Sequence, residues 1–132
     1  MNATVVSSCN VSAANLNFGN YDPVSALPTD GSTTVTVTCA LSSVYSVGLD
    51  QGTGTGASVA VRKMSKSGAL LNYSLYQDAT RLVVWGNTPG TDTLAGVGTG
   101  LAIPLLVYGR IPASQNVAPG AYADTITVSV NF

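Results

Sequence analysis

Short runs of alternating apolar and polar residues follow one another along the chain, separated by Gly, Pro, Asn and Asp. Successive side chains of a β-strand point to opposite faces, so this period of two predicts half-buried strands. No ten-residue stretch carries the apolar stripe of a helix. The pattern predicts strands over Ala3–Val11, Leu16–Phe18, Ser32–Ala40, Val44–Asp50, Val59–Met64, Leu70–Gln77, Leu82–Trp85, Leu101–Ile111 and Tyr122–Phe132.

This organisation predicts a single all-β domain over residues 1–132, either a sandwich or a barrel. No segment is long or biased enough to be an interdomain linker. Pro104 falls within a predicted strand, and because proline cannot donate a ladder hydrogen bond, we expect it at a bulge or an edge position.

The last predicted strand, "YADTITVSVNF", has an apolar face and no successor in the chain to pair with it. Tyr122, Ile126, Val128, Val130 and Phe132 share one face with Asp124. An uncovered strand edge with apolar side chains beside it is an aggregation hazard. Some other segment is therefore expected to cover this edge.

Composition excludes several classes of function. Charged residues make up only 8% of the chain and the net charge is −1, too little to support nucleic-acid binding. No apolar run approaches the roughly 20 residues that a membrane helix needs, so we expect a soluble domain. The chain has no His, which excludes Ser/His and Cys/His catalysis. We predict neither an enzyme nor a cofactor or metal site.

Two cysteines, Cys9 and Cys39, lie in predicted strands, and Cys39 shares a face with Val35 and Val37. They can be buried free thiols, a redox pair or a structural disulfide. The absence of a CxxC spacing and of a basic neighbour favours the disulfide. A disulfide implies an oxidising compartment such as the periplasm or the cell exterior.

Other residues have plain structural interpretations beside functional ones. The cluster Arg62, Lys63 and Lys66 is interpreted as the solvated rim of a hairpin that turns at Gly68, rather than as a ligand patch. The scattered aspartates lack calcium-loop spacing and are expected in turns. Four aromatic residues are candidates for sugar binding but are expected mainly in the core: Tyr73, Tyr76, Trp85 and Tyr108.

An ordered set of motifs resembles the spore coat protein U domain family, which includes subunits of archaic chaperone/usher pili. The motifs are "SCNVSAANLNFGNYDP", "STTVTVTCA", "YSVGLDQG", "LLNYSLYQD", "WG" and "VYGRIPASQNVAPGAYADTITVSVNF". The resemblance covers nearly the whole chain. It implies an incomplete immunoglobulin-like β-sandwich that lacks its last strand, with a disulfide from the first strand to the second.

By resemblance, a donor strand from a partner completes such a sandwich. The implied partners are a periplasmic chaperone, an outer-membrane usher and neighbouring subunits that exchange strands. The implied function is that of a structural pilus (fimbria) subunit, secreted through the periplasm to the cell surface, serving adhesion and biofilm formation. The alternatives are a tip adhesin, a carbohydrate- or surface-binding domain using loops such as "VWGNTPGTD", and a spore coat structural protein.

We predict that seven residues line the acceptor groove for this donor strand. The last strand forms one wall and the first strand faces it. Only eight residues precede Cys9, and the first predicted strand uses most of them, so we expect no donor segment within this chain. The predicted groove residues are Val5, Val11, Tyr122, Ile126, Val128, Val130 and Phe132.

Overall fold

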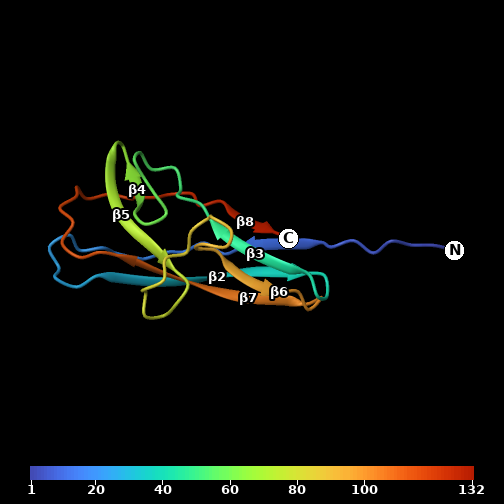
Figure 1. Cartoon of the computed structure of the whole chain (residues 1–132). Helices are drawn as coiled ribbons and strands as arrows, with labels where there is room; N and C mark the ends of the chain where they lie inside the picture. Colours follow the sequence, from blue (N-terminus) through green and yellow to red (C-terminus); the bar gives the residue numbers. More distant parts are fainter.

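The computed structural model describes residues 1–132 as an all-β structure of two sheets (Figure 1). Turns and irregular segments connect the strands, and no helix is long and apolar enough to cross a membrane. The strands are β1 (Cys9–Ala13), β2 (Thr29–Cys39), β3 (Val44–Leu49), β4 (Arg62–Lys66), β5 (Ala69–Tyr76), β6 (Leu94–Val97), β7 (Ala102–Ile111) and β8 (Val128–Asn131).

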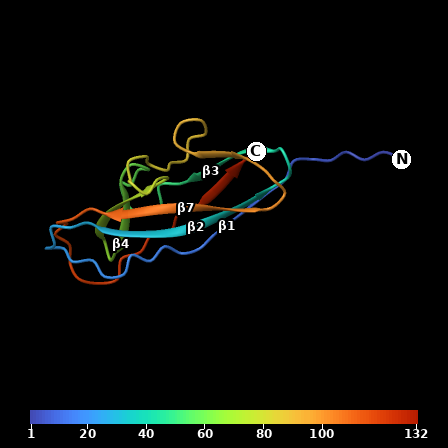
Figure 2. The ribbon, with the colours of Figure 1, turned by 90° about the horizontal axis from the view of Figure 1, so that it is seen from below.

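One sheet has five strands in the order β1-β2-β7-β5-β4, and the other has three in the order β6-β3-β8, all paired antiparallel. Figure 2 shows β1, β2 and β7 side by side, with the N-terminal residues extending away from them. β4 and β5 form the predicted hairpin, whose two-residue turn is Ser67 and Gly68, both at positive φ, as tight hairpins require.

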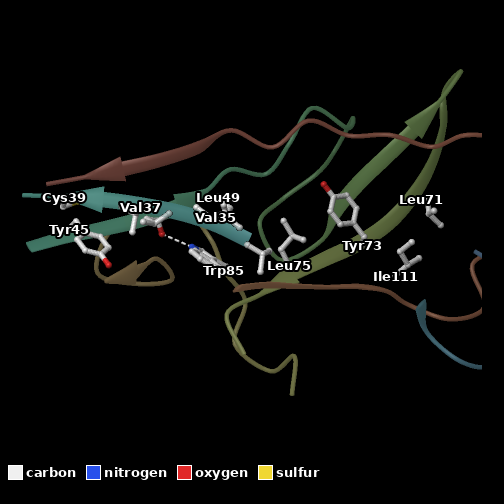
Figure 3. Close-up of a cluster of buried hydrophobic side chains, with 12 residues drawn as sticks. Val35, Val37, Cys39, Tyr45, Leu49, Leu71, Tyr73, Leu75, Trp85 and Ile111 are labelled. Carbon is white, nitrogen blue, oxygen red and sulfur yellow. Dashed lines mark hydrogen bonds between the residues drawn. The ribbon is translucent and has the colours of Figure 1, made fainter. Parts of the chain in front are cut away.

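The core lies between the two sheets and takes every second residue of the long strands (Figure 3). Its alternation is the one predicted from the sequence, including Cys39 on the inward face of β2. The buried core consists of Val35, Val37, Cys39, Tyr45, Val47, Leu49, Leu71, Tyr73, Leu75, Trp85, Val107 and Ile111.

Pro104 lies within β7, opposite Thr36 of β2. β5 pairs with β7 only at residues 108–110, so β7 has an unpaired side at Pro104. The expectation of an edge position is therefore confirmed.

Several predicted strands differ from the observed ones. The predicted strand Ala3–Val11 is wrong before Cys9, because residues 1–8 are exposed and join no ladder. Leu16–Phe18 forms no strand, and Leu82–Trp85 meets β5 through a single bridge at Val84. β6 was missed, because its short sequence LAGV lacks a β-branched run and becomes a strand only by pairing with β3.

The predicted strand Tyr122–Phe132 is divided in the structure. Ala123 forms an isolated bridge with Ser65 of β4, and only Val128–Asn131 joins the ladder with β3. This segment crosses from the edge of the five-stranded sheet to the edge of the three-stranded sheet. A continuous ladder cannot form, because its two partners belong to different sheets.

Candidate functional site

A groove with a cavity volume of about 610 Å³ opens between the two sheets. One wall is the end of β1 at Ala13 with the following segment up to Phe18, and the other is the segment Tyr122–Val128. Core residues of both sheets form its floor. Most of the lining is apolar, including Val35, Leu49, Leu75 and Val107.

A second hollow of about 670 Å³ continues the groove toward the loop Val117–Ala121. The linings of the two hollows share five residues, Leu16, Asn17, Phe18, Met64 and Tyr122. The long cleft is thus one feature with two halves that meet at Phe18.

Leu16 and Phe18 are held in the groove by a pair of glycines on adjacent strands. Gly31 of β2 lies opposite Gly109 of β7. A Cβ on Gly109 would lie 2.7 Å from Cζ of Phe18 and 2.8 Å from Cδ2 of Leu16. The missing side chains therefore let the chain after β1 lie directly on the sheet.

The wall that contains β8 presents an unpaired backbone edge to the groove. Ser65 and Ala123 exchange both backbone hydrogen bonds, and the Asp50 N–H donates to the Thr127 carbonyl. In an antiparallel ladder the residues between such pairs direct their N–H and C=O groups to the opposite side. Those residues are even-numbered, run from Tyr122 to Val130, and are half-buried, whereas most of the odd-numbered ones are exposed.

The wall formed by β1 presents a second unpaired edge. The Ala40 N–H donates to the Ser8 carbonyl and the Ala14 N–H to the Thr34 carbonyl. With the register of Cys9 opposite Cys39, this directs the backbone groups of Cys9, Val11 and Ala13 away from β2. β1 and β8 lie near each other, but no ladder joins them.

The disulfide between Cys9 and Cys39 is present, with 4.1 Å between the two Cα atoms. This confirms the predicted disulfide. The bond joins a non-hydrogen-bonded pair of β1 and β2, where strands approach most closely. It therefore fixes β1, which has only one neighbouring strand, as the wall of the groove.

Asp124 holds the other wall in position. Its Oδ2 accepts a hydrogen bond from the Tyr73 hydroxyl at 2.6 Å, and its Oδ1 accepts from the Thr53 N–H at 2.9 Å. Tyr73 is only 4% exposed. Burial, together with the hydrogen bond to Asp124, raises the pKa of Tyr73 far above its usual value.

Arg62 was predicted on the solvated rim of the hairpin, and this prediction is wrong because its side chain is 0% exposed. Its guanidinium donates hydrogen bonds to four carbonyl oxygens, at 2.7 to 2.9 Å, in β3, the loop after it and the segment of Trp85. Burial lowers the pKa of Arg62. Arg62 thus connects the end of β3 to the β4–β5 hairpin. Its four acceptors are the carbonyls of Leu49, Asp50, Val59 and Trp85.

The predicted groove residues fall into three groups. Tyr122, Ile126 and Val128 line the cavity, and Val11 and Val130 pack against the core. The other two lie apart from the cavity: Val5 is 94% exposed in the N-terminal segment, and Phe132 is 61% exposed after β8.

Sequence reasoning missed several residues of the cavity, among them Leu16, Phe18, Met64 and Tyr73. The alternation in "NLNF" was a signal that Leu16 and Phe18 share an inward face. It was interpreted as a strand rather than as part of the groove wall.

Aromatic side chains do not form an exposed platform at the loop "VWGNTPGTD". Trp85 is 0% exposed, and its indole N–H donates to the Val47 carbonyl at 2.8 Å (Figure 3). The expectation that Trp85 and Tyr73 belong to the core is confirmed, and the alternative of Trp85 as an exposed sugar-binding residue is wrong. No group of three metal-ligating side chains comes together in the structure.

Among solved structures, the chain resembles one chain of the CsuC–CsuE chaperone–tip adhesion subunit pre-assembly complex from archaic chaperone–usher Csu pili of Acinetobacter baumannii. The TM-score is 0.72 at 21% identity, over 98% of this chain and 40% of that chain. HdaB, the minor tip subunit of the E. coli Hda pilus, gives a TM-score of 0.44 at 20% identity, over 93% of this chain and 79% of that one. At such identity the first likeness is one of fold, and it agrees with the predicted β-sandwich.

Sequence comparison gives closer relationships. Protein U of Myxococcus xanthus is 44% identical over 128 residues, which cover 89% of this chain and 71% of that protein. Residues 1–129 match the Spore Coat Protein U domain. The motifs that suggested the resemblance are therefore those of true relatives, and the chain belongs to the spore coat protein U domain family.

Proposed function

We propose that this domain is a structural subunit of a surface pilus, assembled by donor-strand complementation. In this function a strand from another protein enters the groove between the segment that follows β1 and the segment that leads into β8, and completes the sandwich. The observation that carries the proposal is the apolar groove between residues 13–18 and residues 122–128, two stretches of chain that no ladder joins. A strand between them can form main-chain hydrogen bonds with both walls.

The apolar lining supplies the affinity for such a strand. Each apolar side chain that a donor strand buries is worth roughly 1.5 to 3 kcal/mol. Four or five of them give a gross gain on the order of 10 kcal/mol before the strand's ordering cost is subtracted. We propose that Tyr122, Ile126, Val128, Val130 and Val11 contact the inserted strand, with Val5 and Phe132 beyond the cavity at the end where the two chain termini lie.

The proposed partners follow from the chaperone/usher route. A periplasmic chaperone lends the first strand, and a neighbouring subunit replaces it when the outer-membrane usher adds the subunit to the pilus. The disulfide suits this oxidising route. The fold likeness to a chaperone–subunit complex supports the same route. The resulting fibre serves adhesion and biofilm formation at the cell surface.

The proposal is tested by fusing a donor strand behind Phe132 through a short flexible linker. Its sequence alternates valine and threonine, so that the valines enter the groove. We expect a clear rise in Tm over the unfused chain, measured by circular dichroism, because the strand buries apolar surface and pairs both edges.

A matched fusion controls for the added length. It has the same linker and composition, but the valines are grouped in one block, so that only some of them can face the groove. This fusion should raise the Tm far less. Equal Tm values for the unfused chain and the alternating fusion would contradict the open-groove proposal.

A further inference from the structure

One carboxylate interrupts the apolar lining of the groove. Asp124 lies among its lining residues, on the same face of the chain as Tyr122 and Ile126. Figure 3 shows the Tyr73 side chain reaching from β5 toward the chain that leads to β8. The Tyr73 hydroxyl meets Asp124 there, so the one carboxylate of a mostly apolar lining lies in this wall of the groove.

The hydrogen bonds of this carboxylate are distributed unevenly. Oδ1 accepts from the Thr53 N–H, the Thr53 hydroxyl and the Thr125 N–H, at 2.8 to 3.1 Å. Oδ2 accepts only from the Tyr73 hydroxyl. Oδ2 is therefore the less occupied of the two oxygens.

Asp124 forms no direct ion pair, although the buried Arg62 guanidinium is close enough to interact with it electrostatically. The ion pairs of the structure both involve Asp30, with Arg81 and Arg110. The nearby guanidinium of Arg62 is already occupied by four carbonyl oxygens. A donor that enters the groove at this point therefore meets a carboxylate that has no ion-pair partner.

A hydrogen-bonding side chain in the groove removes an ambiguity in the register of the inserted strand. Side chains of a strand alternate with a period of two, so a donor strand that slips by two residues still directs its apolar side chains into the groove. Apolar contacts alone specify register weakly. A single buried polar residue can specify it, because only one alignment satisfies its hydrogen bond.

We propose that Asp124, positioned by Tyr73, sets the register of the inserted strand and selects its sequence. This inference rests on the proposed function. The selected strand is an extended peptide with alternating apolar residues and, at the inward position facing Asp124, one side chain that donates a hydrogen bond, such as Ser, Thr or Lys. A strand with an acidic residue there is excluded.

The test uses synthetic peptides and the intact chain. Each peptide alternates valine and threonine, carries a fluorophore and ends in the same two lysines for solubility. Each inward valine is replaced in turn by Ser, Lys or Glu, and Kd is measured by fluorescence anisotropy. At one position Ser or Lys should bind better than Glu by at least about tenfold, and at the others valine should bind best.

Asp124→Asn identifies the group responsible for the preference. This variant removes the charge with little change of shape, so the ratio of the Glu to the Lys Kd at the special position should fall toward one. Asp92→Asn is the matched control, since Asp92 lies in the loop before β6, outside the lining of the groove. It should leave the ratio unchanged.

The outcomes separate the inference from the proposed function. If no peptide binds, the proposed function fails. If peptides bind but every inward position ranks valine, Ser, Lys and Glu in the same order, the register inference is overturned while strand uptake stands. If Asp124 has only a structural role, Asp124→Asn will weaken the binding of all peptides by the same factor and leave the ratio of the Glu to the Lys Kd unchanged. That result would also overturn the inference. The wild-type peptide series decides the matter even if Asp124→Asn does not fold.

Discussion

Two buried polar residues, Tyr73 and Arg62, connect segments that are distant in the sequence. Each is surrounded by apolar core and uses its polar atoms fully, Arg62 toward four carbonyls and Tyr73 toward Asp124. A buried polar group left without a partner is costly, so such contacts hold their segments in one arrangement. The segment 122–127 gains from Tyr73 a link to the five-stranded sheet in addition to the Ser65 bridge.

Tyr73 should make the domain sensitive to alkaline pH. Its pKa is raised in the folded state, so above about pH 10 the unfolded chain loses the phenolic proton while the folded chain retains it. The free energy of unfolding should then fall with pH, by at most about 1.4 kcal/mol per pH unit from this residue.

Urea unfolding of wild type and Tyr73→Phe from pH 7 to 11 measures this effect. The variant should be less stable by about 1 to 3 kcal/mol at pH 7, because Asp124 loses a hydrogen bond. The two curves should run parallel up to pH 9 and converge above pH 10. A constant difference up to pH 11 would show that Tyr73 does not carry the alkaline effect.

At the scale of elements, the two walls of the groove are held by different means. β8 and the segment before it are attached to β4 and β3 in turn. β1 has only β2 beside it, and the disulfide adds a covalent link. Because an edge strand with one neighbour detaches easily, the disulfide should matter for the shape of the groove as well as for stability.

Reduction of the disulfide should therefore weaken both folding and strand uptake. The bond closes a loop with a sequence separation of 30, which corresponds to about 3 to 4 kcal/mol in the chain-entropy model. Urea unfolding of the oxidised and reduced wild type measures this loss without changing any side chain.

The double variant Cys9→Ala with Cys39→Ala should resemble the reduced protein and should not respond to reductant. The alternating valine peptide should bind both forms more weakly than it binds the oxidised chain. Unchanged peptide affinity after reduction would mean that β2 alone holds β1 in place.

At the scale of the whole molecule, the fold leaves exposed two strand edges that a complete sandwich would cover with a further strand. The free edges of β1 and β8 lie beside half-buried apolar side chains, and the chain carries few charges to prevent association. Natural sheet proteins usually protect such edges with charges, prolines or covering segments. Here the groove remains open in the single chain.

The isolated chain should consequently self-associate as its concentration rises. Sedimentation velocity over a wide concentration range should show oligomers for the unfused chain and a monomer for the fusion with the alternating strand, since that strand pairs both edges. The fusion with grouped valines should still associate. A monomeric unfused chain at high concentration would contradict this expectation.

The sequence by itself determined the local features: the all-β class, the inward face of each long strand, the disulfide partners and the apolar face of the last segment. Each follows from the alternation of apolar and polar residues or from a short sequence motif. These local patterns were enough to identify the family and to place Tyr122, Ile126 and Val128 at the groove.

Only the tertiary structure decided which edges stay unpaired and which residues close the groove. The path of residues 122–131 from β4 to β3, the placement of Leu16 and Phe18 on two glycines, and the burial of Arg62 all depend on partners distant in sequence. A charged residue such as Arg62 reads as exposed unless the carbonyls that surround it are known. Alternation fixes which way a side chain points, but strand pairing is non-local, and pairing creates the groove.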